Sequence, residues 1–300
     1  MIGYLLDMLV FIGIYAIVAI SLNLEYGFTG LGNFGKVAFF MTGAYTYAIL
    51  SQAGANFILC IGAAALVSAL FGYLVSLPAL RLREDYLAIV TLTFGEIIRT
   101  VIKSQGIGNG VRGISVAPLF QYPAYEANVL AYDILVLIFL GICFAFSQLL
   151  ANSPYGRILR GIREDQTAAQ SYGKNIGRYK AQVFTLGSAI AGIGGAIFAL
   201  YIGYIEPDQF LPTFTFTFWI MVMLGGPGNN WGAVLGAAIV QIFERGTIIL
   251  KDYIHLPFDP NNVRYVLFGI LILIVLFYRP GGLIKESPVR PPKLKEPANV

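Results

Sequence analysis

Long apolar runs alternate with short polar stretches along almost the whole chain. A helix that crosses a bilayer needs roughly 20 mostly apolar residues, and most of the runs reach or approach that length. They fall at about 4–26, 34–52, 56–80, 86–103, 129–151, 181–203, 213–226, 231–249 and 263–279. The pattern predicts an all-α fold, a polytopic transmembrane helical bundle of about eight or nine spans with glycine-rich helix breaks.

Composition agrees with this class and bounds the domain organisation. Of the 300 residues, 57% are hydrophobic and 12% are charged, against about 25% charged residues in soluble domains. Little chain is left for a soluble domain, so we expect one membrane domain over 1–284. The tail, 285–300, is proline-rich and cationic, which predicts disorder. The first apolar run has no signal-peptide cleavage pattern and is expected to be a retained helix.

Lys and Arg residues are distributed unevenly between the two predicted sides of the membrane. With the first residue outside, 14 of the 20 cations fall on the cytoplasmic side, nine in loops (Lys36 among them) and five in the tail. Short loops rich in these residues stay in the cytoplasm. We therefore expect a multi-pass protein of a prokaryotic cell (inner) membrane with a cytoplasmic C-terminus. The net charge of +4 is spread over several loops and forms no nucleic-acid footprint.

The loop 152–180 is long and rich in charge. Pro154 and Gly156 break the preceding span, and the sequence then predicts one short amphipathic helix to about Tyr172, ended by Gly173 and Gly177. Its apolar side holds Ile158, Leu159 and Ile162, and its charged side holds Arg157, Arg160, Arg163, Glu164 and Asp165. Two interpretations stay open: a helix lying on anionic lipid, or a docking helix for a cytoplasmic partner.

Several short motifs resemble nucleotide-binding or catalytic signatures but lack the required context. The run GLGNFGK at 30–36 matches the dinucleotide pattern G-x-G-x-x-G and nearly matches a P-loop. However, a membrane helix precedes it instead of a strand, and Val37 replaces the Ser or Thr that holds magnesium. The single histidine, His255, has no second His or Cys near it in sequence that would suggest a metal site. We therefore expect no enzymatic activity and no cofactor in this chain.

Glycine is frequent, with 34 residues, and two clusters of it contain asparagine. The stretches 27–36 and 224–232 each separate two apolar segments. Irregular backbone at membrane depth is tolerated where protein buries it or where it lines a water-filled cavity, and broken helices bind solutes in transporters. The candidates for the substrate path are therefore Asn23, Gly30, Asn33, Gly35, Gly225, Gly226, Asn229 and Asn230. Two tight cytoplasmic turns are the alternative, whereas the glycines of 187–195 predict close helix packing.

Charged residues inside the predicted spans are candidates for a structural role or for transport. Glu96 and Arg99 lie three residues apart, on one face of the run 86–103. A charge at mid-membrane costs about 2.5–3.5 kcal/mol on insertion scales, so such residues usually pair inside the bundle. A structural ion pair and a role of Glu96 in the substrate path both stay open. Glu25 and Glu244 lie nearer to helix ends, where a charge is less costly.

Four long blocks of this sequence match blocks of one transporter family in the same order. They are SLNLEYGFTGLGNFGKVAFFMTGAYT (21–46), RLREDYLAIVTLTFGEIIR (81–99), GRILRGIREDQTAAQSYGKNIGRYK (156–180) and MLGGPGNNWGAVLGA (223–237). They resemble the LivM-type branched-chain amino acid permeases of ABC importers. The resemblance implies a subunit that forms the membrane path with a second, homologous permease. Two cytoplasmic ATPase subunits, which bind ATP and magnesium, would drive it, and an extracytoplasmic solute-binding protein would deliver the solute.

The resemblance also implies which residues couple transport to ATP hydrolysis. Permeases of ABC importers share an E-A-A-x-x-x-G pattern in this loop, and the chain has Thr167, Ala168, Ala169 and Gly173 at the matching positions. The implied coupling residues are Arg157, Arg160, Arg163, Glu164, Asp165, Ala168, Ala169 and Gly173. Lys36 stands where the family more often has His.

Three alternatives remain. Urea and other amide permeases share these blocks, so the solute is open. A self-sufficient secondary carrier would use Glu96 or Glu25 as a proton relay. A membrane-embedded enzyme would need a constellation of His, Cys or Ser that the sequence does not show.

Overall fold

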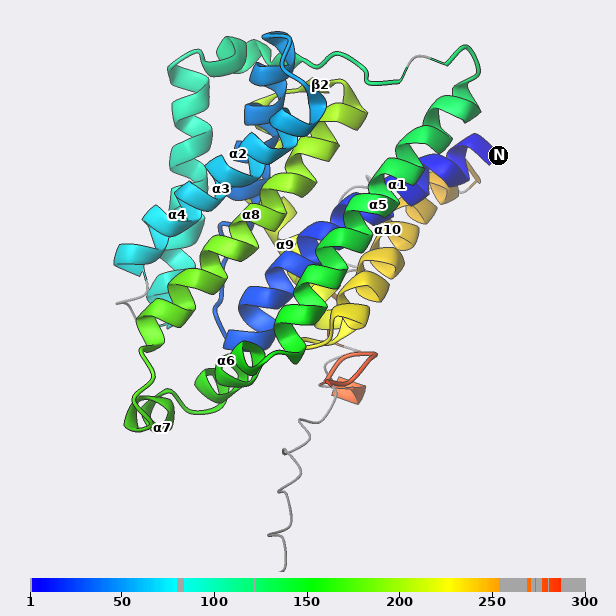
Figure 1. Ribbon diagram of the computed structural model, residues 1–300. Helices are drawn as coiled ribbons and strands as arrows, with labels where there is room; N and C mark the ends of the chain where they lie inside the picture. The colour runs from blue at the N-terminus through cyan, green and yellow to red at the C-terminus, as the bar shows by residue number, and fades with distance from the viewer. Residues whose placement is uncertain are drawn as a thin grey trace, which may run out of the picture.

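The computed structural model describes residues 2–79, 84–120, 122–253, 269–270, 273, 277–279 and 281–286, which are mostly helical (Figure 1). The long helices are α1 (Ile2–Leu22), α2 (Lys36–Gln52), α3 (Phe57–Ala79), α4 (Glu84–Ser104), α5 (Tyr125–Asn152), α8 (Ile176–Ile202), α9 (Pro212–Gly225) and α10 (Asn230–Tyr253). The shorter elements are the π-helical turn η1 (Asn23–Gly27), the 3-10 turns η2 (Ile107–Arg112) and η3 (Pro207–Gln209), helices α6 (Pro154–Glu164) and α7 (Gln166–Ser171), and strands β1 (Ile114–Ser115) and β2 (Tyr204–Ile205). Eight of the predicted apolar runs are therefore helical. The ninth, 263–279, lies almost wholly outside the described residues, as do His255 and the tail beyond 286.

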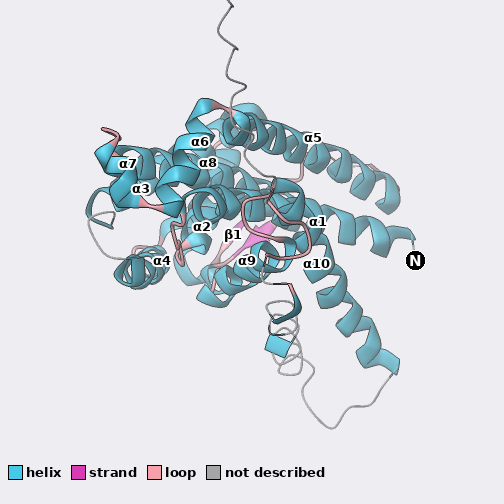
Figure 2. Ribbon diagram, turned by 90° about the horizontal axis from the view of Figure 1, so that it is seen from below, coloured by secondary structure: helices cyan, strands magenta, loops and turns pink. Residues whose placement is uncertain are grey.

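Two helices, α1 and α8, lie at the centre of the bundle. In the most apolar part of α8, 78% of the residues are buried, and in α1 61% are, against 33% in α3 and 28% in α5. Seen from the end that carries α6, α3 and α4 lie on one side of α2 and α8, and α1 lies on the other side with α5 and α10 flanking it (Figure 2). Within the described ranges, four stretches are long and apolar enough to cross a membrane: Gly3–Gly27, Phe57–Pro78, Tyr125–Asn152 and Ile176–Ile202. The all-α fold is confirmed, and the number of crossings stays a prediction.

Local sequence signals divide the loop 152–180 into two helices. The Ser153 side chain accepts a hydrogen bond at the start of α6, with Pro154 at the first helical position. The prediction of one continuous helix in this loop is wrong, because Asp165 has an extended backbone. Its carboxylate accepts hydrogen bonds from the N–H groups of Thr167 and Ala168, at 2.8 and 3.0 Å, and so begins α7. Asp165 is therefore a capping residue between two short helices.

Glycines on α8 allow neighbouring helices to approach it closely. A Cβ atom on Gly195 would overlap the carbonyl oxygen of Phe40 in α2, and one on Gly192 would overlap the side chain of Ser68 in α3. Any larger residue at these positions would force the backbones apart, which removes packing contacts on both sides. The predicted close packing of the glycine-rich run 187–195 is confirmed.

The two ends of the bundle carry different elements (Figure 1). One end holds α6, α7 and the segment 281–286, and the opposite end holds η2 and the β1–β2 pair, in which Ile114 lies opposite Ile205. The loop 152–180 and the start of the tail thus lie at the same end, as the charge distribution predicts. Gly177 falls in the first turn of α8 and does not end a helix, contrary to expectation.

Candidate functional site

A buried ion pair lies where the chain passes from α1 to α2. Neither Glu25 of η1 nor Lys36, the first residue of α2, has exposed side-chain surface, and Lys36 Nζ lies 2.6 Å from Glu25 Oε1. Asn33 Nδ2 donates a further hydrogen bond of 2.9 Å to Glu25 Oε2. The expectation that Glu25 is inexpensive to place is therefore wrong, and Lys36 is the buried first residue of a helix and not an exposed loop cation. Both charges are inside the bundle, where they need each other as partners.

Neighbouring helices hold the irregular segment 30–35 in place. Trp219 Nε1 of α9 donates to the Asn33 carbonyl at 3.1 Å, and the Trp219 ring stacks on Phe34 with centroids 4.6 Å apart. The Phe34 N–H donates to Thr91 Oγ1 of α4 at 3.1 Å. A Cβ on Gly35 would overlap the Thr91 carbonyl oxygen. The segment is thus an irregular stretch that forms hydrogen bonds with α4 and α9, as a break in a membrane helix requires. It is not a solvated tight turn.

The two glycine-rich stretches meet through two asparagines. Asn23 Nδ2 donates to Asn230 Oδ1 at 3.0 Å, and the Gly228 N–H donates to Asn23 Oδ1 at 2.9 Å. From α5, Ser147 Oγ donates to Asn230 Oδ1 at 3.2 Å, and Asn230 Nδ2 donates to Gln148 Oε1 at 3.0 Å. This network couples η1, the second glycine-rich stretch and α5, so a movement of one of them strains the others.

The segment 281–286 pairs its backbone with the second glycine-rich stretch. The N–H groups of Leu283 and Ile284 donate to the carbonyls of Leu224 and Gly225, at 3.0 and 2.9 Å. Gly226 has φ of 115°, a backbone conformation that side chains rarely permit. The end of α9 is therefore closed by a distant part of the chain and not by the helix that follows it.

Two arginines of α6 point toward these segments. Arg163 Nη2 lies 2.6 Å from Glu286 Oε2, and Arg160 Nε lies 2.9 Å from Glu286 Oε1. Arg163 Nη1 also donates to the carbonyl of Gly27, and the Arg160 guanidinium lies 5.3 Å from the centre of the Phe28 ring. The two Arg163 contacts are charge-assisted hydrogen bonds, which are stronger than neutral ones, whereas Arg160 contributes an ion pair and a cation–π contact. They connect α6 to both the first glycine-rich stretch and the segment 281–286.

A cavity of about 550 Å³ lies where these parts converge. We call this region the junction, and it comprises 27–36, 224–232, α6 and 281–286. The cavity is lined by Tyr26, Gly27, Gly30, Arg163, Pro227, Gly281, Lys285 and Glu286. Asn229 contributes to the junction by donating from Nδ2 to the Lys285 carbonyl at 3.0 Å. The structure thus brings the candidate path residues of both stretches together, and only Gly30 among them lines the cavity.

Glu96 lies away from the junction, in an ion-pair network that reaches the opposite end of the bundle. Arg99 Nη2 lies 2.7 Å from Glu96 Oε2, and Arg99 Nη1 lies 2.9 Å from Asp208 Oδ1 in η3. Lys103 pairs with the same carboxylate, and its hydrogen bond holds the pKa of Asp208 below the usual range. The predicted Glu96–Arg99 ion pair is confirmed, and a role of Glu96 in the substrate path stays a prediction.

The other residues of the predicted coupling loop lie near or at the surface of this chain. Arg157, Glu164 and Ala168 are exposed, and Ala169 is half-buried. No residue of α7 is buried. Gly173 follows α7 with φ of 72°, and a Cβ there would meet no atom within 4 Å. The turn after α7 therefore needs glycine for its backbone conformation, and α7 presents small side chains outward.

Sequence reasoning missed several residues that form the junction or hold it in place. Ser147 and Gln148 are polar residues inside the apolar run 129–151, and that interruption was a usable signal. Trp219 and Glu286 gave none, because their partners lie 186 and 123 residues away along the chain.

The sequence over residues 4–276 matches the family described as branched-chain amino acid transport system / permease component. Among curated proteins, the chain is 32% identical to the probable branched-chain amino acid transport permease protein LivM of Methanocaldococcus jannaschii, over 96% of this chain and 95% of that protein. It is 33% identical to the high-affinity branched-chain amino acid transport system permease protein LivM of Escherichia coli, over 94% of this chain and 69% of that protein. The BraD permease of Pseudomonas aeruginosa is 27% identical over 92% of both chains. No solved structure matches the chain.

Proposed function

Because the chain belongs to the branched-chain amino acid transport permease family and is an integral membrane protein, we propose that it forms the membrane path of an ABC importer. Its solutes would be branched-chain or similar amino acids, the substrates that the names of its relatives give. A second homologous permease would complete the path, two cytoplasmic ATPase subunits would bind ATP and magnesium, and an extracytoplasmic binding protein would deliver the solute. The chain itself would carry out no chemical step.

The observation that carries this proposal is the contact of Arg163 with two parts of the junction at once. Its guanidinium binds Glu286 at 2.6 Å and donates to the carbonyl of Gly27. An ATPase that grips the exposed α7 and the outer side of α6 would therefore pull directly on the first glycine-rich stretch. No intervening loop would absorb the movement.

The second glycine-rich stretch would follow the first. Asn23 holds Gly228 and Asn230 by hydrogen bonds of 2.9 and 3.0 Å, and the segment 281–286 holds the end of α9. A rotation of α6 would thus move both stretches as one unit. Buried hydrogen-bond networks of this kind favour discrete arrangements over gradual deformation, which suits a path that alternates between outward-open and inward-open states.

The test is an Arg163→Gln substitution in the complete transporter, reconstituted into vesicles with its ATPases and binding protein. A hydrogen bond to a charged group is worth about 1.5–3 kcal/mol, so the leucine imported per ATP hydrolysed should fall by about tenfold. ATP hydrolysis itself should continue, because the ATPase active sites are untouched. Arg163→Lys, which keeps the charge, should recover part of the loss.

Two further variants make the result specific. Arg160→Gln removes one ion pair with Glu286 and leaves the Arg163 hydrogen bond to Gly27 in place, so its effect should be smaller than that of Arg163→Gln. Lys174→Gln removes an exposed cation of the same loop and should couple like the wild type. If Arg163→Gln also imports as much leucine per ATP as the wild type, the junction does not transmit the movement of the ATPase to the membrane path. If the wild-type complex imports no branched-chain amino acid at all, the proposed solute is wrong.

A further inference from the structure

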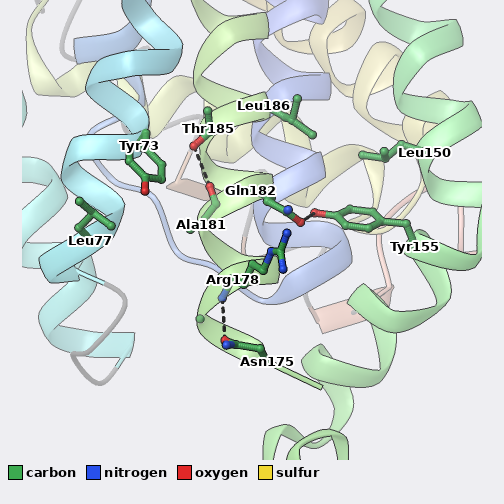
Figure 3. A pocket seen from close by; sticks show the side chains of 11 residues that line it. Tyr73, Leu77, Leu150, Tyr155, Asn175, Arg178, Ala181, Gln182, Thr185 and Leu186 are labelled. Carbon is green, nitrogen blue, oxygen red and sulfur yellow. Dashed lines mark hydrogen bonds between the residues drawn. The ribbon is translucent and has the colours of Figure 1, made fainter. Parts of the chain in front are cut away.

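A groove separate from the junction lies on α8, between α3 on one side and the end of α5 with the start of α6 on the other. Its volume is about 740 Å³. Figure 3 shows Tyr73 and Leu77 of α3 facing Leu150 and Tyr155 across the first turns of α8. It opens beside exposed apolar side chains of both flanking helices, among them Leu74 of α3, which is 51% exposed. The mouth of the groove is therefore flanked by surfaces that suit lipid and not water.

The floor of the groove continues along α8 as a strip of partly exposed apolar residues. Leu186, Ala189 and Ile193 are all half-buried and follow one another at the spacing of one helix face. On either side of the strip, α3 and α5 expose large apolar residues along most of their length, for example Leu70 at 57% and Ile142 at 58%. The strip thus continues the groove as a partly exposed apolar surface on α8, with exposed apolar side chains on both sides of it.

The end of the groove near α6 is polar and carries an unpaired positive charge. Arg178 is exposed and forms no ion pair with any residue in the described part of the chain. Next to it, the Tyr155 hydroxyl donates to Gln182 Oε1 at 3.2 Å, which leaves the amide NH2 group of Gln182 as a donor at the rim. The Asn175 side chain caps α8 by accepting from the Arg178 N–H at 3.1 Å. The groove therefore offers a guanidinium and an amide donor at one end and hydrocarbon contacts along the rest.

We propose that this groove binds one anionic phospholipid. The phosphate of the headgroup lies against the Arg178 guanidinium and the Gln182 amide, and one acyl chain lies along Leu186, Ala189 and Ile193. A cation at the end of a spanning helix reaches the headgroup level of the bilayer, and Tyr73 and Tyr155 are of the residue type that favours that level. Free phosphate would use only the polar end and leave the apolar strip uncovered. The lipid therefore accounts for both halves of the groove.

The test measures lipid retention by the intact permease, purified with its partner subunits in detergent. Native mass spectrometry would compare phosphatidylglycerol with phosphatidylcholine of the same acyl chains, offered in equal amounts. The wild type should retain phosphatidylglycerol preferentially. Arg178→Gln should lower that preference by about fivefold, the effect of one cation near an anionic headgroup. Leu186→Trp, which places a bulkier side chain in the groove but keeps the charge, should also lower retention of phosphatidylglycerol.

The matched control is Arg157→Gln, which removes an exposed cation of α6 that does not line the groove, and it should retain phosphatidylglycerol like the wild type. Three results would overturn the proposal. One is equal retention of the two lipids by the wild type. Another is wild-type retention in both the Arg178→Gln and Leu186→Trp variants. The third is complete displacement of phosphatidylglycerol by millimolar inorganic phosphate, which would mean that the polar end alone binds a free anion.

Discussion

Replacing Lys36 with methionine should destabilise the protein far more than the loss of an ordinary surface charge. Lys36 and Glu25 are 2.6 Å apart and neither side chain is exposed. Removing one partner of a buried pair leaves the other charge buried and uncompensated, which costs about 3–5 kcal/mol. The Asn33 hydrogen bond to Glu25 softens this penalty but cannot neutralise the charge.

A second substitution separates the cost of an unpaired charge from the loss of packing. In the double variant Glu25→Gln/Lys36→Met both charges of this pair are removed, and the glutamine carbonyl can still accept from Asn33. Replacing a whole buried ion pair by neutral groups of similar volume is often close to neutral. The double variant should therefore be more stable than Lys36→Met alone. In the double-mutant cycle whose single variants are Glu25→Gln and Lys36→Met, the interaction energy should reach at least about 2 kcal/mol.

Unfolding by titration with SDS in mixed micelles measures these differences, followed by tryptophan fluorescence. The chain has two tryptophans, and Trp219 is hydrogen-bonded to the Asn33 carbonyl beside the ion pair. The control is Lys103→Met, which removes a partly exposed partner of Asp208 and should unfold close to the wild type, because surface ion pairs contribute little. If Lys36→Met is as stable as Lys103→Met, or if the two single effects simply add, the ion pair does not stabilise this break.

Two further predictions concern the loop after α7 and the opposite end of the bundle. Gly173→Val should lower the amount of solute transported per ATP hydrolysed, because a left-handed backbone costs a residue with a side chain about 1–2 kcal/mol. It should not lower membrane abundance, because this turn packs against nothing. The control Gly141→Val, at an exposed helical site with equal space, should transport as much solute per ATP as the wild type. The pKa of Asp208 is lowered by its hydrogen bond to Lys103, so its stabilising contribution is present at neutral pH and is lost as the pH falls through that lowered pKa. The stability difference between wild type and Asp208→Asn should therefore vanish in acid, and a difference independent of pH would contradict the assignment.

The long helices were predictable from the sequence because a membrane span is encoded locally. An apolar run of sufficient length is helical whatever surrounds it, since no other local structure satisfies its backbone in lipid. The run 181–203, for example, corresponds to α8 within a few residues. The Glu96–Arg99 pair was predictable for the same reason, because helical spacing fixes which residues share a face.

The junction was only partly predictable, because its contacts depend on irregular backbone. The glycine and asparagine content of 27–36 and 224–232 predicted the two breaks. The pairing of Glu25 with Lys36 could not be predicted, since they lie 11 positions apart across η1, a loop and a turn, and no fixed periodicity relates the ends of such a segment. The division of α6 from α7 was easier to predict from the sequence. Asp165 lies just before Thr167 and Ala168, whose N–H groups it caps, and an Asp at such a position is typical of a helix start.

The contact between Arg163 and Glu286 spans 123 residues, and this has a consequence for biosynthesis. Residues 281–286 are synthesised after α6 and both glycine-rich stretches. Until then the carbonyls of Leu224 and Gly225 lack the donors of Leu283 and Ile284, and Arg163 lacks its carboxylate. A nascent chain interrupted just before residue 281 would contain α1 to α10 but an unfinished junction, with these polar groups still unpaired.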